Sequence, residues 1–416
     1  MLRNLVEPVI LVALIATVSW AAPPQPADLV NEAAKTARFA TDPETRALCL
    51  AEVAVARHDL GQTEEATEAV EEAVACALAA PNQMAKALSL RTIALRLQRM
   101  DSTRAQRLLA DAAREAQDLK YAAERAVALR EIAVAGLKLG VADAPTLVQQ
   151  ALESARKVDT GVFRGACLRD LAAGVAPYNA PLAETTFAEA RDAMTTPGPD
   201  DGGRALAQAE LAGTWAPSNL AAAQAVADSI AGEALHAEAL SQMASALAPS
   251  SPEKALEFSR SLPTGLMRAR AVAAAAAALP AESAVVAGAL GRAALEGLGD
   301  GTGEAIDKVR ADAALALSRT ATAEAVALTA LIRDKDLRNQ TICSVAERVG
   351  ETDAAAGIAL LNDVDDPVAA EPATVALAAR LVAKQPDEAL ALVRKVISRR
   401  LRVQGLLGVA RGLSAS

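Results

Sequence analysis

The chain has 416 residues, of which 52% are hydrophobic, so it can bury a large core. Its 42 Lys and Arg residues against 51 Asp and Glu residues give a formal net charge of −9, which argues against a general nucleic-acid binder because such proteins need a basic surface. Aromatic residues make up only 2% of the chain, which argues against base-stacking platforms and aromatic cages.

The first 21 residues have the pattern of a secretory signal peptide. Arg3 provides a positive start, an apolar run extends over Val9–Val18, and Ser19 and Ala21 place small residues at the −3 and −1 positions of a cleavage site. The apolar run is shorter than the roughly 20 residues that span a bilayer, and no other stretch resembles a transmembrane segment. We therefore expect export, cleavage near Ala21, a Pro-rich spacer at residues 22–26, and a periplasmic or extracellular mature chain without a transmembrane segment.

From residue 27 onward, one motif repeats along the chain. Each copy has a large residue, two spacers, a large residue followed by a small one, two more spacers and a third large residue, as in Leu50, Val53-Ala54 and Arg57. Spacings of three, four and seven place these residues on one face of a helix. The first positions of the eleven copies are Leu50, Leu90, Leu129, Leu168, Gln208, Leu240, Val272, Arg310, Ile342, Thr374 and Leu406.

Turn signals and a second amphipathic helix follow the motif copies. Pro252 and Pro386 stand where the first turn of a helix tolerates proline, and Gly61 with Thr63 supplies a helix stop and a cap. Alanine, a strong helix former, is abundant, and no stretch alternates as a strand would. A single helical hairpin cannot bury its apolar face, whereas stacked hairpins can. The sequence therefore predicts an all-α fold, an α-solenoid of about eleven stacked helical hairpins that form a right-handed superhelix.

The first full copy resembles a tetratricopeptide repeat in its spacing. It follows the pattern W-x2-L-G-x2-Y…A-x3-F…P with Leu50, Val53, Ala54, Arg57, Ala66, Val70, Ala73 and Pro81. Aliphatic residues replace the Trp and Tyr of the family, and the period of 32 or 39–40 residues differs from the family's period of about 34, so a HEAT-like helical repeat is the rival classification. The resemblance covers nearly all of the mature chain and implies a scaffold for protein interaction.

Two glycine-rich loops interrupt the repeats. The Pro/Gly loop at residues 197–203 separates residues 27–196, where the copies are 39 or 40 residues apart, from residues 204–416, where most copies are 32 apart. Residues 297–303 precede the degenerate copy, but they lack the strand and the Gly-Lys-Ser/Thr of a phosphate-binding loop. Both loops are candidate hinges between solenoid segments.

Export makes the four cysteines eligible for disulfides. Cys49 begins one helix and Cys76 ends its antiparallel partner, so this pair is the candidate disulfide. The alternative is that Cys49 and Cys167 fill a packing position that other copies fill with Ser or Ala. No Cys-x-x-Cys and no Cys/His pair has the spacing of metal ligands, so we expect no metal site.

The sequence contains no recognisable catalytic constellation or cofactor motif, so we expect no catalytic residue and no cofactor. His58 lies in a polar stretch at the end of a helix, and His236 takes the position, four residues before the motif, where other copies carry a cation. We interpret these leading cations as structural, in ion pairs or in contacts with helix ends. They are Arg46, Lys86, Arg125, Arg164, Arg204, Arg268, Arg338 and Arg402.

Three arginines form the candidate ligand-binding site. Arg91, Arg130 and Arg169 follow the first large residue in three consecutive copies. In the tetratricopeptide family this position faces the concave groove, so the resemblance implies a stripe of guanidinium groups about 10 Å apart that could bind the carboxylates of an acidic peptide or polysaccharide. The alternative is that Glu131 and Asp170, which directly follow two of the arginines, neutralise the stripe.

These observations favour an exported, non-enzymatic repeat scaffold that binds a protein or peptide through the solenoid groove. The alternatives are an exported all-α polysaccharide-active enzyme of the α/α-toroid type and a structural spacer protein of the cell envelope. Convergence of Tyr121, Tyr178 and Trp215 with His236 in one cleft would favour the enzyme. The motif copy at Leu406 has no helix after it, so we expect a partner to cover its apolar flank, for example through end-to-end self-association.

Overall fold

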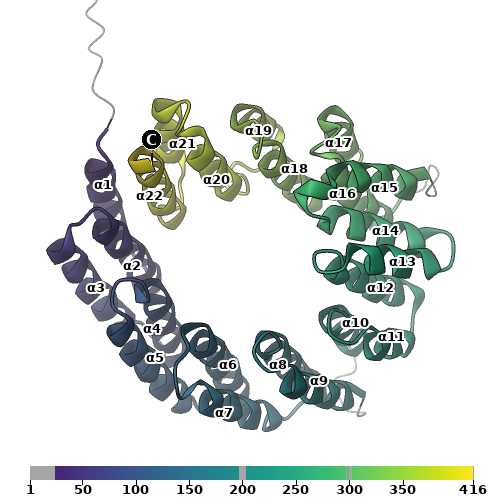
Figure 1. Cartoon of the computed structure of the whole chain (residues 1–416), viewed down its shortest axis with the longest axis horizontal. Helices are drawn as coiled ribbons and strands as arrows, with labels where there is room; N and C mark the ends of the chain where they lie inside the picture. Colours follow the sequence, from purple (N-terminus) through teal and green to yellow (C-terminus); the bar gives the residue numbers. More distant parts are fainter. Residues whose placement is uncertain (1–23, 196–202, 297, 299–301, 416) are drawn as a thin grey trace, which may run out of the picture.

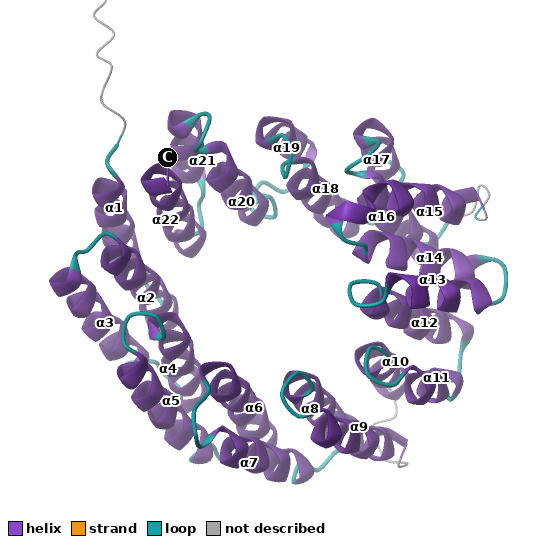
Figure 2. Cartoon of the chain, in the orientation of Figure 1, coloured by secondary structure: helices purple, strands orange, loops and turns teal. Residues whose placement is uncertain are grey.

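The computed structural model describes residues 24–195, 203–296, 298 and 302–415. Within these residues it contains twenty-two α-helices, two short 3₁₀ helices and no β-strand (Figures 1 and 2), which confirms the predicted all-α fold. None of the described helices is sufficiently long and apolar to cross a bilayer. The predicted signal peptide at residues 1–21, part of the spacer at 22–26 and most of the loop at 197–203 lie outside the described residues.

The described helices form eleven hairpins in two layers (Figure 1), which confirms the solenoid of stacked hairpins. Even-numbered helices contact one another in succession, form the inner layer, and carry the motif copies. The inner helices are α2 (Pro43–Asp59), α4 (Gln83–Leu97), α6 (Ala122–Leu139), α8 (Gly161–Val175), α10 (Arg204–Trp215), α12 (Glu233–Leu247), α14 (Leu266–Ala278), α16 (Glu304–Leu317), α18 (Lys335–Val349), α20 (Glu371–Leu381) and α22 (Arg399–Ala415). The outer helices are α1 (Pro26–Arg38), α3 (Thr63–Leu78), α5 (Ser102–Gln117), α7 (Ala144–Arg156), α9 (Ala180–Thr195), α11 (Leu220–Asp228), α13 (Pro252–Ser261), α15 (Ala284–Glu296), α17 (Thr322–Thr329), α19 (Ala354–Leu360) and α21 (Pro386–Lys395).

Local sequence signals set the ends of the helices. At the start of α2 the Asp42 carboxylate accepts a hydrogen bond from the Thr45 amide at 2.8 Å, and at the start of α4 the Asn82 side chain accepts one from the Ala85 amide at 2.7 Å. Gly140 ends α6 in the left-handed conformation, with φ at 64°. Such caps fix where each helix stops, so that the chain can turn and pack the next helix against it.

The motif residues form the core between the inner and outer layers. Leu50 and Leu129 are at most 1% exposed, and the alanines Ala54 and Ala133 are fully buried. The small alanine side chain allows the neighbouring helices to approach closely, and the interior is filled mostly by aliphatic groups. One apolar cluster continues from the repeats before the loop at residues 197–203 to those after it, so the two sequence segments share a core.

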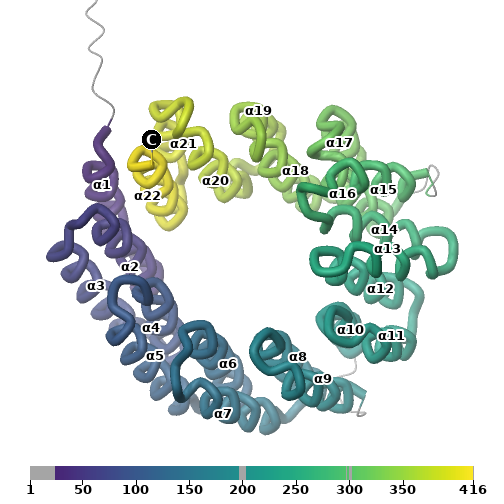
Figure 3. The backbone as a smooth tube through the Cα atoms, viewed as in Figure 1, coloured from purple at the N-terminus to yellow at the C-terminus, as the bar shows by residue number. Residues whose placement is uncertain are grey.

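The two ends of the chain meet and close the solenoid into a ring (Figure 3). Helix α1 packs along α22 and also contacts α2, so it occupies the outer position of the eleventh hairpin. Leu29 and Val30 on α1 and Leu406 and Leu407 on α22 are each at most 1% exposed. The flank of α22 that we expected a partner to cover is therefore covered by the chain's own first helix. The expectation failed because α1 precedes the first motif copy and is identified only by its long-range packing.

Ion pairs along the outer rim show that α1 is equivalent to the other outer helices. In each pair an arginine near the end of one outer helix contacts a glutamate on the next, at 2.6–2.9 Å. The pair from α21 to α1 crosses the closure. Because these side chains are largely exposed, each pair contributes little free energy, and their recurrence indicates a shared geometry. The pairs are Arg38–Glu72, Arg156–Glu189, Arg292–Glu324 and Arg394–Glu32.

Most of the leading cations contact the end of the preceding outer helix. The Arg402 guanidinium, for example, donates through Nε and Nη2 to the Val396 carbonyl oxygen at 2.8 and 2.5 Å. A cation at this end also interacts favourably with the helix dipole. Arg338 instead pairs with Asp365. The arginines that donate to a carbonyl six residues earlier are Arg46, Arg125, Arg164, Arg268 and Arg402.

We predict that removal of residues 22–41 opens the ring. Loss of α1 exposes the apolar flank of α22 and leaves only the smaller contact between α2 and α22, which includes the Gln404–Glu52 hydrogen bond, to join the two ends. Small-angle scattering should show a larger radius of gyration, and amide hydrogen exchange in α22 should become faster.

Two point variants test the same closure without a deletion: Leu29→Ala alters the closure, and Leu152→Ala is the matched control away from it. Leu29→Ala at the closure and Leu152→Ala on α7, where Leu152 is 3% exposed, should each cost about 2–5 kcal/mol of unfolding free energy. Only Leu29→Ala should accelerate exchange selectively in α22. Equal exchange in α22 for both variants would contradict closure by α1.

We also predict that Arg402→Gln lowers the free energy of unfolding by about 1–2 kcal/mol, because the Val396 carbonyl loses a charged donor. Lys86 is the matched control, since it holds the same motif position but its side chain forms no hydrogen bond or ion pair with another described residue. Lys86→Gln should cost less than about 0.5 kcal/mol in the same denaturant titration. A similar loss in both variants would show that the carbonyl contact is unimportant.

Candidate binding surface on the inner wall

The three predicted arginines lie on consecutive inner helices and connect them. Arg91 on α4 reaches the Glu131 carboxylate on α6 at 2.9 Å, and Arg130 on α6 reaches Asp170 on α8 at 2.5 Å. Arg169 on α8 continues the series to α10. We call this series the inner-wall ladder, and its members are Arg91, Glu131, Arg130, Asp170, Arg169 and Glu210.

Each arginine of the inner-wall ladder is thus already paired. Arg130 also contacts Glu131 at 2.8 Å, and Arg169 also contacts Asp170 at 2.8 Å. Burial would lower the pKa of Arg169, but Asp170 and Glu210 outweigh that effect and raise it. The three arginines thus lie on consecutive helices, as the motif predicted. Neighbouring carboxylates neutralise them, which agrees with the alternative interpretation that Glu131 and Asp170 pair with the arginines.

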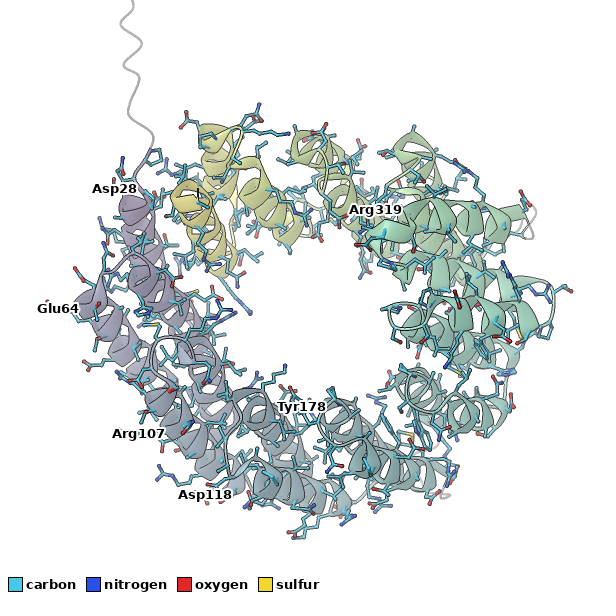
Figure 4. All side chains as sticks on the ribbon, viewed as in Figure 1. Asp28, Glu64, Arg107, Asp118, Tyr178 and Arg319 are labelled. Carbon is cyan, nitrogen blue, oxygen red and sulfur yellow. The ribbon has the colours of Figure 1, made fainter. Side chains whose placement is uncertain are left out.

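The carboxylates of the inner-wall ladder are more exposed than its guanidinium groups. The arginine side chains are 21%, 18% and 14% exposed in chain order, whereas the carboxylate side chains are 35%, 37% and 44% exposed. With the described side chains drawn, the centre of the ring remains open (Figure 4). The more exposed members of these ion pairs on α6, α8 and α10 are therefore the negative ones.

A second charged group, missed by the sequence analysis, lies on α12, α14 and α16. Arg270 is 5% exposed and pairs with Glu238, which also accepts a hydrogen bond from Lys308 Nζ at 3.3 Å. Burial alone would raise the pKa of Glu238, but the hydrogen bonds from Arg270 and Gln242 and the nearby cations lower it to about 2. Glu238 is therefore firmly ionised at neutral pH, and the pair ties three inner helices together.

Asp312 lies beside this group and differs from it in being unpaired. Its carboxylate forms no hydrogen bond or ion pair with another residue in the described part of the chain. Burial raises its pKa to about 6, and Glu238 adds to the rise, whereas Arg270 and Arg348 oppose it. Asp312 holds the same motif position as Glu131 and the other ladder carboxylates, two residues after the first motif residue. In the ladder, an arginine on the preceding inner helix pairs with that carboxylate. On α14, which precedes Asp312, the corresponding residue is Ala273, which cannot pair with it.

Arg348 holds the adjacent helix ends in place. Its guanidinium donates to the Leu315 carbonyl at 2.8 Å and to the Ala277 carbonyl at 2.6 Å, near the C-terminal ends of α16 and α14. Burial lowers the pKa of Arg348, although the two carbonyls and the helix dipoles favour a cation there. This residue joins three inner helices, and its motif position gave no sequence signal for that role.

The aromatic residues and histidine that would suggest an enzyme do not converge in one cleft. Trp215 is 2% exposed, stacks on Phe187 and donates to the Glu184 carboxylate at 2.9 Å. Tyr121 and Tyr178 are exposed at the start of α6 and just after α8. His236 lies in the first turn of α12, where its Nε2 is 3.7 Å from Asp228, a residue of α11.

The cysteines are free thiols in this structure, including Cys49 on α2 and Cys76 on α3. Burial raises the pKa of Cys49 to about 12, so its reactive thiolate scarcely forms at neutral pH. Cys49 and Cys167 occupy the shared motif position in α2 and α8. In the part of the chain that the structure describes, no group of three His, Cys, Asp or Glu side chains is placed to hold a metal ion.

We predict that Asp312→Asn stabilises the protein at neutral pH. The folded pKa of Asp312 is above the usual 3.8, so its contribution to stability is present in full below pH 3.8 and is lost as pH rises through about 6. With allowance for partial exposure, the variant should gain about 1–2 kcal/mol at pH 7.5 and less at pH 4.5 in urea titrations.

Asp118→Asn is the control for this experiment. Asp118 is exposed on the outer side of the ring (Figure 4), and its carboxylate forms no hydrogen bond or ion pair with another described residue. Its substitution should leave the difference between the two pH values unchanged. A gain for Asp312→Asn that does not depend on pH would contradict the raised pKa.

No family model matches this chain, and no curated protein matches it. Among solved structures, the chain is similar to the crystal structure of Ton1535 from Thermococcus onnurineus NA1, with 16% sequence identity and a TM-score of 0.35. The match covers 82% of this chain and 95% of that chain. Likeness of this degree assigns no function.

Proposed function

We propose that the chain is an exported, non-enzymatic ring scaffold of tetratricopeptide-like repeats that binds an extended segment of a partner protein along its inner wall. The inner-wall ladder is the observation that supports this proposal most directly. It offers charged groups on four consecutive inner helices, and the centre of the ring that these helices surround is open (Figure 4). A peptide that crosses these helices would meet a repeated site.

The partner segment should carry positive charges. The arginines of the ladder are the more buried members of their pairs, so an acidic peptide would have to displace the carboxylates that cover them. A lysine or arginine of the partner can instead share the exposed carboxylates without breaking the existing pairs. We therefore replace the acidic peptide expected from the sequence with a basic one.

Helix spacing suggests the form of the segment. Packed helices lie about 8–10 Å apart, which is therefore the expected distance between successive carboxylates. A polyproline II helix has three residues per turn and rises about 3.1 Å per residue, so every third side chain recurs at about 9.3 Å on one side. Because a single exposed ion pair is worth at most about 1 kcal/mol, several such contacts must act together.

Export fits the ring architecture. Cleavage near Ala21 would leave all of α1, which begins at Pro26, in the mature chain. The proposed periplasmic or extracellular scaffold therefore keeps the helix that closes it.

The proposal predicts selective binding of a lysine-containing peptide to residues 22–416. A fluorescent peptide with four Lys-Pro-Pro repeats should bind, while Gln-Pro-Pro and Glu-Pro-Pro peptides of equal length should bind at least tenfold more weakly in fluorescence anisotropy. The triple variant Glu131→Gln, Asp170→Asn, Glu210→Gln should lose the lysine peptide and gain the glutamate peptide, because it leaves three arginines unpaired.

The outer rim supplies a matched control for the same peptides. The triple variant Glu72→Gln, Glu189→Gln, Glu324→Gln removes equal charge from arginine pairs on the outside of the ring. It should bind the lysine peptide as the unmodified chain does. Equal loss in both triple variants would indicate a general charge effect, and failure of all three peptides to bind would favour the spacer role.

A further inference from the structure

A pocket lies where the ring closes, on inner helices from opposite ends of the sequence. It has a volume of about 720 Å³, within the usual range for small-molecule sites. Its walls come from α22, α2 and α4, with a contribution from the end of α6. We call it the seam pocket, and its lining includes Glu52, Val55, Leu95, Arg96, Arg99 and Arg411.

The charge of the seam pocket is opposite to that of the whole chain. Three arginines face two carboxylates there, Glu52 and Asp59, whereas the chain carries −9 overall. Glu52 is occupied by Arg96 at 3.0 Å and by Gln404, whose Nε2 lies 3.3 Å from the same oxygen. Arg99 and Arg411 then face one remaining carboxylate, Asp59, so the pocket has a local excess of one positive charge.

Arg99 and Arg411 are the free cations of the seam pocket. Both side chains are exposed, and neither forms a hydrogen bond or an ion pair with another of the described residues. Arg99 follows α4, and Arg411 lies on α22, so the two come from different walls. Two guanidinium groups on separate walls are suited to a ligand with two carboxylates, since each can bind a carboxylate through two parallel hydrogen bonds.

Apolar side chains lie between these two cations. Helix α2 separates α22 from α4 in the inner layer, and it contributes Val55 to the pocket. Leu95 on α4 and Leu139 at the end of α6 extend this apolar surface, and all three residues are partly exposed. An inorganic anion would leave the apolar surface uncovered, whereas an aliphatic chain would cover it.

We propose that the seam pocket binds a small organic dicarboxylate with a short aliphatic body. One carboxylate contacts Arg99, the other contacts Arg411, and the aliphatic body lies over Val55. This site is separate from the inner-wall ladder and does not depend on the proposed peptide binding. Because its walls include both α22 and α2, the ligand joins the two ends of the chain.

The test uses the full mature chain, with succinate, glutarate and adipate as probes. At least one of them should bind in calorimetry, raise the melting temperature and slow amide hydrogen exchange in α22. The corresponding diamide should do none of these. Hexanoate should bind at least fivefold more weakly than adipate if adipate is the preferred probe, because it has only one carboxylate.

Variants locate the site. The double variant Arg99→Gln, Arg411→Gln should weaken dicarboxylate binding at least tenfold. The matched double variant Arg104→Gln, Arg107→Gln on the outer helix α5, where Figure 4 labels Arg107, should not change it. The ladder variant Glu131→Gln, Asp170→Asn, Glu210→Gln should also leave it unchanged, which separates this proposal from peptide binding.

Three results would overturn the proposal. The first is sulfate binding as tightly as the dicarboxylates, which would indicate a general anion site. The second is dicarboxylate binding that survives the Arg99 and Arg411 substitutions. The third is the absence of binding for all three dicarboxylates at millimolar concentration.

Discussion

The ring depends on one constraint, which is that every helical hairpin must bury apolar residues on both of its flanks. In an open solenoid the first and last repeats leave one flank exposed and need special capping residues. Here α1 packs against α22 and supplies the outer helix that the last repeat lacks. The closure therefore removes both ends with a single hairpin whose helices lie far apart in the sequence, and it needs no specialised capping repeat.

The apolar core continues without a break across the closure, whereas it is divided between α14 and α20. One apolar cluster extends from α20 through α22 and α1 to α14, across the closure. Between α14 and α20 the buried residues fall into smaller clusters, and polar contacts such as those of Arg348 join the helices there. Regions with few apolar contacts open locally at lower free energy. If the ring opens, we therefore expect the opening to begin between α14 and α20.

The sequence predicted the parts of the fold that depend on local spacing. The motif identified the inner helices from Leu50 to Leu406. The leading cations were predicted to form either ion pairs or contacts with helix ends, and most of them contact helix ends. Closure could not be predicted because α1 carries no motif copy. The positions of Arg91, Arg130 and Arg169 were also predictable, but the sign of the exposed charge was not. It depends on which member of each ion pair is the more buried, and that is a property of packing.

The two proposed sites differ in how they depend on closure. The inner-wall ladder lies on consecutive helices, so it would persist in an open ring. The seam pocket contains Gln404 and Glu52, which are 352 residues apart in the sequence and meet only when α22 lies beside α2. A ligand that binds only the closed form stabilises that form, by about 2.7 kcal/mol when its concentration is 100 times its dissociation constant. Occupation of the seam pocket would thus oppose opening at the α1–α22 closure but not between α14 and α20, while occupation of the ladder would leave both equilibria almost unchanged.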